Sequence, residues 1–313
     1  MSNRRFAVFA WAVLIYNVAV VLWGAFVRAT GSGAGCGNHW PLCNGSVVPR
    51  APALQTVIEF THRASSGVAL LSVAVLLVWA YRGFPRGHIV RRGALLSVVF
   101  MLTEALLGAA LVLLDHVAQN KSVGRGYSIS LHLINTLTLL ATIALTAWWA
   151  GGRRGPAPSR WRRSAWLLGA AMAGFVLLGI SGAIAALGDT LFPASSLQAG
   201  LAQDAAPSAH IFLRLRVFHP VLAAVVAFLI FYGVWNAVKI RPGEKRQWAA
   251  LALTILTVVQ IALGAANVGL LAPVWMQMIH LFVADALWIS LVLYSAAALA
   301  REPAPAGTAV ARA

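Results

Sequence analysis

Eight long apolar runs constrain this chain more than any other feature of its sequence. Each is close to the ~20 residues that a helix needs to cross the hydrocarbon core of a bilayer. Of the 313 residues, 60% are hydrophobic and only 10% are charged, which is too apolar for a soluble domain of this size. We therefore predict an all-α integral membrane protein with transmembrane helices at about 6–27, 57–81, 93–114, 128–150, 165–187, 212–238, 248–271 and 275–299.

The basic residues predict how these helices are oriented. The formal charge is +16, and most lysines and arginines lie at the termini or in the short loops after the second, fourth and sixth helices. Cytoplasmic loops carry this excess, so we predict a multi-pass protein of the cell membrane with both termini cytoplasmic and no nucleic-acid partner. The first apolar run is too long for a signal-peptide core and is predicted to be retained. The long loops 29–56 and 188–211 then lie on the outer side.

Similar motifs recur in the two halves of the chain. The run VLWG ending at Gly24 is similar to VLLG ending at Gly179, and EALLGAA at 104–110 is similar to QIALGAA at 260–266. Each half has four helices, so both begin on the same side of the membrane, which predicts two tandem, parallel-related four-helix bundles. We divide the chain into an N-terminal half 1–150, a cytoplasmic basic linker 151–164, a C-terminal half 165–300 and a disordered tail 301–313.

Four histidines occupy similar positions in this repeat. His62 and His219 lie toward the outer ends of the second helices, and His132 and His280 toward the outer ends of the fourth. Facing histidines on two helices of a bundle can supply both axial ligands of a haem iron. A lone helix histidine is more often structural, but four at similar depth favour two bis-histidine haem sites near the outer face.

Arginines lie beside these predicted sites. Arg28 ends the first helix, Arg63 follows His62, and Arg214 and Arg216 precede His219. A guanidinium can pair bidentately with a haem propionate, so Arg28 and Arg63 are candidate propionate contacts. Anchoring at the membrane interface is the alternative role.

The two cysteines lie in the first outer loop. Cys36 and Cys43 are seven residues apart, with a proline and several glycines nearby that let the chain fold back. On the outer side this spacing favours a small disulfide loop, which is either structural or redox-active. Two reduced thiols are the alternative, and the loop offers too few ligands for a metal.

Three carboxylates lie within predicted helices. Glu59 is one turn before His62, and the second half has no counterpart, which predicts unequal halves with carboxylate-assisted chemistry in the first only. Glu104 and Asp285 are predicted to be structural, because a membrane carboxylate must be protonated, paired or hydrogen-bonded. Gln260 replaces Glu104 in the second half, so hydrogen bonding alone can suffice at that position.

Three motifs resemble those of the heme A synthase family, membrane enzymes that convert haem O to haem A for cytochrome oxidases. They are TGSGAGC at 30–36, WPLCNG at 40–45 and Glu59-x-x-His62-Arg63, together with the three later histidines. The resemblance covers essentially all eight predicted helices. It implies an oxidoreductase that oxidises the C8 methyl group of haem O to a formyl group by successive hydroxylations, the geminal diol losing water.

The resemblance also implies roles for the residues described above. It makes His219 and His280 the axial ligands of a permanent haem b, and His62 and His132 the site of the substrate haem O. Glu59 matches the family's carboxylate and is the expected catalytic residue, for proton transfer or for stabilising a cationic intermediate.

Partners follow from the same resemblance. Cys36 and Cys43 match the family's outer-loop pair, and a farnesyl-transferring haem O synthase is the expected upstream partner. Membrane lipid surrounds the helices, an electron acceptor of unknown identity is required, and a homo-oligomer is compatible with the sequence.

One departure from the pattern is His219-Pro220, where His62-Arg63 would predict an arginine. The regular helix is expected either to kink at Pro220 or to begin near His219.

Two other functions explain part of this sequence. A two-haem membrane cytochrome b that exchanges electrons with quinone explains the histidines, but it does not explain Glu59 or the cysteine loop. A two-repeat transporter predicts polar or broken helices at the membrane midplane, where this sequence offers few polar residues.

Overall fold

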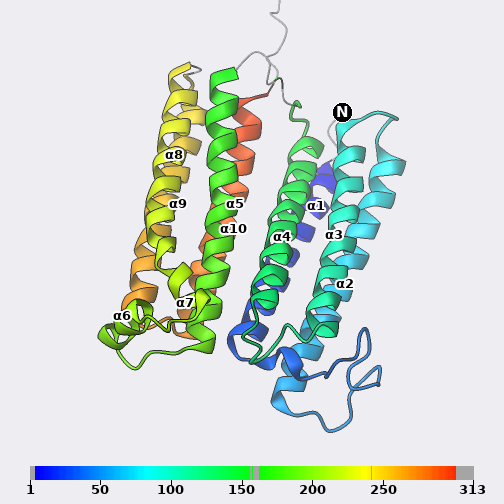
Figure 1. The fold of residues 1–313 in the computed structure, drawn as a ribbon. Helices are drawn as coiled ribbons and strands as arrows, with labels where there is room; N and C mark the ends of the chain where they lie inside the picture. Colours follow the sequence, from blue (N-terminus) through cyan, green and yellow to red (C-terminus); the bar gives the residue numbers. More distant parts are fainter. Residues whose placement is uncertain (1–3, 156, 158–161, 241, 301–313) are drawn as a thin grey trace, which may run out of the picture.

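Eight long helices dominate the computed structural model (Figure 1), which describes residues 4–155, 157, 162–240 and 242–300. All eight are long and apolar enough to cross a membrane, as predicted, and they fit a multi-pass membrane protein. Their ends extend beyond most of the predicted apolar runs, because polar terminal turns belong to the helices as well. The spans are α1 (Arg4–Ala29), α2 (Leu54–Gly83), α3 (Ile89–Leu113), α4 (Val123–Ala150), α5 (Arg162–Leu191), α7 with α8 (Ile211–Arg216 and Phe218–Ile240), α9 (Glu244–Gly269) and α10 (Val274–Ala298).

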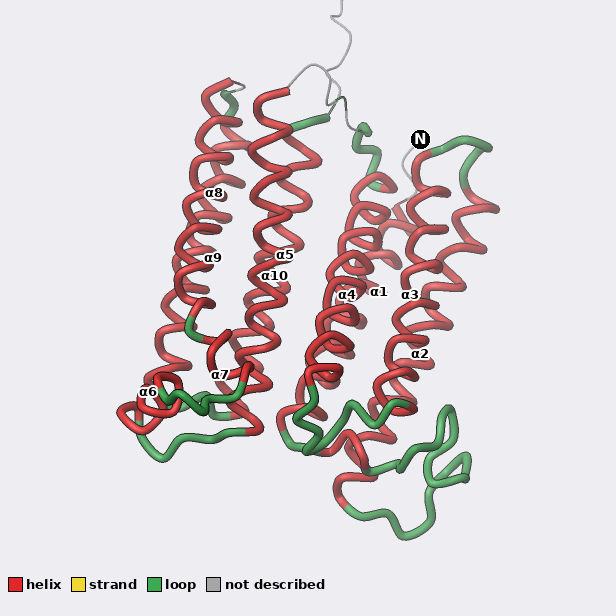
Figure 2. The backbone as a smooth tube through the Cα atoms, viewed as in Figure 1, coloured by secondary structure: helices red, strands yellow, loops and turns green. Residues whose placement is uncertain are grey.

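The helices are arranged in two groups that follow the chain. Figure 1 shows α1–α4 on one side and α5 with α7–α10 on the other. The long loop after α1, with the 3₁₀ turn η1 (Ser32–Ala34), lies at the same end as the short helices α6 (Leu197–Ala205) and α7, as Figure 2 also shows. We call this the loop end. The chain crosses between the groups at the opposite end; part of the predicted linker 151–164 and the whole predicted tail 301–313 lie outside the described residues.

The sixth membrane span is interrupted near its start. A turn at Val217 separates α7 from α8, which begins at Phe218. His219 and Pro220 therefore occupy the first turn of α8, where a proline's missing N–H leaves no intrahelical hydrogen bond unmade. This outcome matches the second of the two expectations for Pro220, and the predicted continuous helix over 212–238 was wrong at this point.

The buried core lies where the two groups meet. Leu140 and Ile143 of α4, Leu168 of α5 and Leu291 of α10 are fully buried in one cluster. In the same cluster the Trp288 indole N–H donates to the backbone oxygen of Leu137 at 2.7 Å, which joins α10 to α4. Many large apolar side chains elsewhere on the helices are exposed, for example Ile15, Leu71 and Phe228, which is expected where helices face lipid.

Candidate functional site

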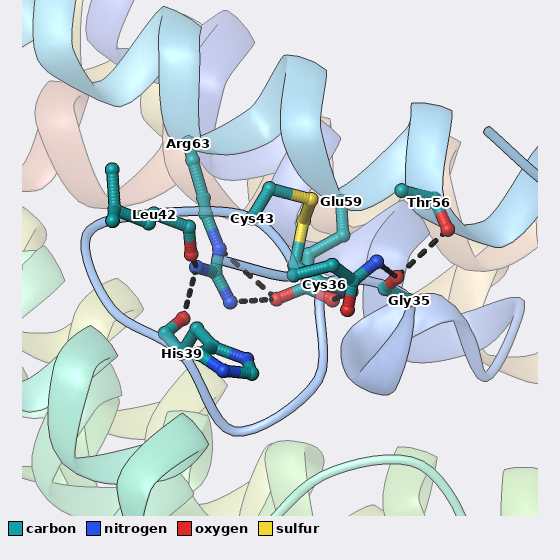
Figure 3. Close-up of polar contacts among 9 residues, drawn as sticks. Gly35, Cys36, His39, Leu42, Cys43, Thr56, Glu59 and Arg63 are labelled. Carbon is teal, nitrogen blue, oxygen red and sulfur yellow. Dashed lines mark hydrogen bonds and ion pairs between the residues drawn. A yellow bond between two sulfur atoms is a disulfide. The ribbon is translucent and has the colours of Figure 1, made fainter. Parts of the chain in front are cut away.

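Glu59 is a buried carboxylate whose two oxygens both have hydrogen-bond donors. It lies in the second turn of α2 and is 3% exposed. The Cys36 backbone N–H donates to Oε2 at 2.8 Å, and the Arg63 guanidinium donates to Oε1 from Nε at 3.1 Å and from Nη2 at 2.5 Å. Figure 3 shows these contacts converging beside the cysteines. A carboxylate held this way has a fixed position at the loop end of the helices.

Cys36 and Cys43 form a disulfide, which confirms that prediction. Both sulfurs are buried beneath the loop that they close. Arg63 also donates from Nη1 to the backbone oxygens of His39 and Leu42, so one guanidinium holds both the loop and Glu59 (Figure 3). The disulfide loop and the Glu59 carboxylate are therefore one connected unit.

The loop meets α2 at a position that requires glycine. Thr56 donates from Oγ1 to the Gly35 backbone oxygen at 2.7 Å. A β-carbon on Gly35 would lie 2.4 Å from the Gln55 backbone oxygen, so no side chain fits there. Since backbone packs on backbone, the position of Cys36 relative to Glu59 is set by the start of α2.

Each of the four predicted histidines faces a glycine of the preceding long helix. His62 lies against Gly24, His132 against Gly108, His219 against Gly182 and His280 against Gly264. A β-carbon would come within 2.9, 3.8, 3.0 and 3.2 Å of the respective ring. By these contacts the counterpart of Gly24 in the second half is Gly182. The repeat in the sequence had instead matched Gly24 to Gly179, which faces Leu133 and Leu137 of α4.

The histidines are paired within each half. His62 and His132 are close enough to interact electrostatically, and so are His219 and His280. The pairs therefore come from α2 with α4 and from α8 with α10, as the repeat predicted.

The surroundings of the ring nitrogens fit ligation of an iron. Nδ1 of His62, His132 and His280 is buried and has no hydrogen-bond partner among the described residues, which is unusual for a buried polar atom. Nδ1 of His219 lies 2.8 Å from the Ser181 hydroxyl, an arrangement that leaves Nε2 for another ligand. Among the described residues no three His, Cys, Asp or Glu side chains converge as a metal site. Two imidazoles are enough for an iron that a porphyrin already holds.

The candidate propionate arginines have protein partners. Arg28 donates to the Ala186 backbone oxygen and to Thr190 on α5, and to the Gln277 side chain on α10, each within 2.9 Å. It therefore joins the two helix groups, a role that the sequence did not suggest. With Arg63 committed to the disulfide loop, propionate binding by either arginine stays a prediction.

Second-half arginines are also engaged. Arg216 pairs with Asp189 at 2.8 Å and Asp204 at 2.9 Å, and Arg214 donates to the Pro207 backbone oxygen. Arg125, which was not among the predicted site residues, is 2% exposed in the first turn of α4 and donates to the Ala118 and Asn120 backbone oxygens. Its sequence context carried no signal, because it resembles an ordinary interfacial arginine.

The two remaining helix carboxylates differ from each other. Glu104 contacts His132, with 3.2 Å between Oε1 and Nδ1, although the ring is not aligned for a hydrogen bond. Asp285 is 2% exposed, and its Oδ2 has no hydrogen-bond partner among the described residues. The structure therefore does not supply that oxygen with the pairing or hydrogen bond that was expected. Both carboxylates were predicted to be structural, and the contact of Glu104 with the predicted ligand His132 was not part of that prediction.

Comparison with known proteins matches residues 7–292 to a family described as cytochrome oxidase assembly protein. Two Thermus thermophilus proteins, each named protoheme IX farnesyltransferase, are 48% identical over 298 residues, covering 95% of this chain and 49% of theirs. Proteins named heme A synthase from Halalkalibacterium halodurans and Bacillus licheniformis are 36% identical over 142 residues and 44% identical over 124. These matches cover 45% and 39% of this chain, and 47% and 40% of the relatives. The chain thus spans about half the length of the curated relatives it matches.

Proposed function

The chain belongs to the heme A synthase family of cytochrome oxidase assembly proteins, and from this membership we propose that it is an oxidoreductase converting haem O to haem A. The reaction proposed is oxidation of the C8 methyl group of haem O to a formyl group. In each of two successive hydroxylations the methyl carbon loses two electrons to an acceptor outside the chain and gains one oxygen atom from an external source, and the resulting geminal diol loses water. Haem b, when bound, would supply a one-electron redox centre for this oxidation.

The observation that carries the proposal is the unequal distribution of carboxylates over two similar histidine pairs. Glu59 is one turn from His62 and Glu104 touches His132, whereas the residue touching His280 is the neutral Gln260. We assign haem O to the first pair, because a carboxylate can accept protons released during methyl oxidation. Glu59 is the proposed catalytic residue, held in place by Arg63 and the Cys36 backbone.

The second pair is the proposed site of permanent haem b. His219 is oriented by Ser181 through its Nδ1, which fixes one ring nitrogen toward the protein and the other toward a ligand. Replacing His219 or His280 by Ala is expected to remove the tightly bound haem b. In contrast, Glu59→Ala is expected to retain haem b and stop haem A formation.

Orientation and supply of substrate belong to the same proposal. The loop end faces outward and both termini face the cytoplasm of a cell membrane, by the distribution of basic residues. A farnesyl-transferring enzyme must supply haem O. The Thermus thermophilus relatives carry that activity in their name, and about half of their length lies outside the match to this chain.

Haem extraction and chromatography test the proposal. The full chain is expressed with a source of haem O, purified, and compared with Glu59→Gln, which keeps the side-chain shape but removes the charge. Haem A or hydroxylated haem O is expected in the wild type, and unmodified haem O in the variant. Glu244→Gln is the matched control, because Glu244 is an exposed carboxylate in the first turn of α9. If wild type contained only haem b, the electron-transferring cytochrome would replace the synthase as the better reading.

A further inference from the structure

The two halves use the same position of their third long helix to contact the fourth-helix histidine. In α3, Glu104 lies 3.2 Å from His132 Nδ1; in α9, Gln260 lies 3.2 Å from His280 Nε2. Four residues later, Gly108 and Gly264 face the same two rings. Residues four apart share a helix face, so Glu104 and Gln260 are equivalent positions with different charge.

Within the part of the chain that the structure describes, Glu104 lies in a side-chain hydrogen-bond network and Gln260 does not. Asn135 donates from Nδ2 to Glu104 Oε2 at 2.6 Å, and the Thr136 hydroxyl lies 2.5 Å from Oε1. Thr103 in turn donates to Asn135 Oδ1 at 2.5 Å, so the network ties α3 to α4. Asn135 and Thr136 follow His132 by three and four residues, one helical turn away.

The second half lacks the partners that would make such a network. Three and four residues after His280 the chain has Val283 and Ala284, which offer no side-chain hydrogen bond. Accordingly, the Gln260 Oε1 is buried without a hydrogen-bond partner. The difference between the halves therefore extends beyond one substitution to the whole environment of the position.

A carboxylate beside a ligand histidine has a known physical effect. When the carboxylate accepts a hydrogen bond from the ring nitrogen that does not ligate, it fixes the ring orientation and makes the ligating nitrogen more basic, which favours the more positive, oxidised iron. Glu104 Oε1 lies 3.2 Å from His132 Nδ1, within reach of this bond once the ring is aligned. Gln260 is neutral and lies against Nε2 of His280 rather than Nδ1, so it does not supply this effect. We propose that Glu104 is a positioning residue of the substrate site, which orients His132 and strengthens its hold on oxidised haem, and that Gln260 leaves the haem b site without this effect. This inference rests on the proposed haem sites.

Exchanging the two residues tests the inference. Each haem's midpoint potential and affinity are measured by optical redox titration and haem titration of full-length Glu104→Gln, Gln260→Glu and the double variant. In Glu104→Gln we expect about 10–100-fold weaker haem binding at the His132 site. Each tenfold loss confined to the oxidised form raises the potential of a one-electron couple by about 59 mV. Gln260→Glu is expected to lower the potential of the other haem, and Glu104→Asp to restore part of the wild-type value.

Matched variants separate failure of this inference from failure of the proposed function. If wild type binds two haems, His132→Ala loses one, and Glu104→Gln changes neither potential nor affinity, the positioning role is overturned while the haem sites stand. A lower melting temperature of Glu104→Gln with unchanged haem potentials would make Glu104 merely structural. If His132→Ala loses no haem, both the site and the inference fail.

Discussion

Replacing the four histidine-facing glycines by alanine should produce a graded loss of haem. A β-carbon needs at least 3.4 Å from a neighbouring atom for ordinary contact, whereas it would have 2.9 Å at Gly24, 3.0 Å at Gly182 and 3.2 Å at Gly264. The facing ring must therefore move by about 0.5, 0.4 and 0.2 Å respectively. At Gly108 the distance is 3.8 Å, so the ring need not move and Gly108→Ala is the matched control.

The magnitude follows from the cost of overpacking a core, about 1–3 kcal/mol. If that cost falls on the haem-bound state, it weakens haem binding about 5- to 150-fold, since about 1.4 kcal/mol is a factor of ten. The helices themselves should gain about 0.5–1 kcal/mol from each Gly→Ala change, because glycine is a poor helix former. This gain offsets only part of the overpacking cost, so a loss of haem larger than the change in melting temperature is the expected signature of a crowded histidine ring.

The assay measures haem per chain and the thermal melting of each purified variant. We expect Gly24→Ala to deplete the His62 site and Gly182→Ala to deplete the His219 site, with Gly264→Ala weaker and Gly108→Ala fully loaded. Equal haem loss in all four variants would show that helix packing in general, rather than room for the histidine ring, controls binding. Full loading of Gly24→Ala would refute the reasoning directly.

Three further predictions concern the rest of the chain. The double variant Cys36→Ser, Cys43→Ser should lower the free energy of unfolding by about 2.5 kcal/mol, from the loop-entropy relation for a separation of seven residues, and should slow haem A formation because Glu59 is held less firmly. Denaturant melts measure the first effect and turnover the second, and an unchanged turnover rate would show that the disulfide does not position Glu59. Desolvation lowers the pKa of His88, whose neutral ring accepts a hydrogen bond from the Val90 N–H at the start of α3. The stability that this bond contributes is therefore present above the unfolded pKa of about 6.5 and is lost as pH falls through the lower folded pKa. A pH series of melting temperatures should show this loss in the wild type and not in His88→Asn. Arg28→Met should weaken the contact between the helix groups and make their melting separable by calorimetry, whereas a single unchanged transition would rule out that role.

The membrane spans could be predicted because the bilayer fixes their length and composition. Polar terminal turns, such as the start of α4 at Val123, fall outside an apolar window and were missed. The short helix α6 was also missed, since a polar loop between spans has no bilayer to impose a length on its helices. Most of α7 fell inside the predicted sixth span, but its separation from α8 was not part of the predicted bounds.

The site was predicted only where a residue carries its own signal. The disulfide followed from spacing and turn residues, and the pairing of the histidines within each half from their repeat, whereas haem ligation by these histidines stays a prediction. The contact of Glu104 with His132 was invisible, because these helices are apolar on all sides and hydrophobic periodicity cannot show which face points inward. Propionate binding by Arg28 and Arg63 stays a prediction, and the partners that the structure gives them depend on tertiary packing that no local pattern encodes.

The Arg28 contacts also have a consequence for how the molecule is made. Its acceptor Gln277 is synthesised 249 residues later, which at about 5–20 residues per second is a delay of about 12–50 s. During that interval the guanidinium can reach only lipid headgroups, water or the helices already inserted. The partners that complete both the Arg28 cluster and the buried Leu137–Trp288 bond arrive on α10. Among the membrane helices that the structure describes, α10 is synthesised after all the others, and its arrival completes both of these contacts.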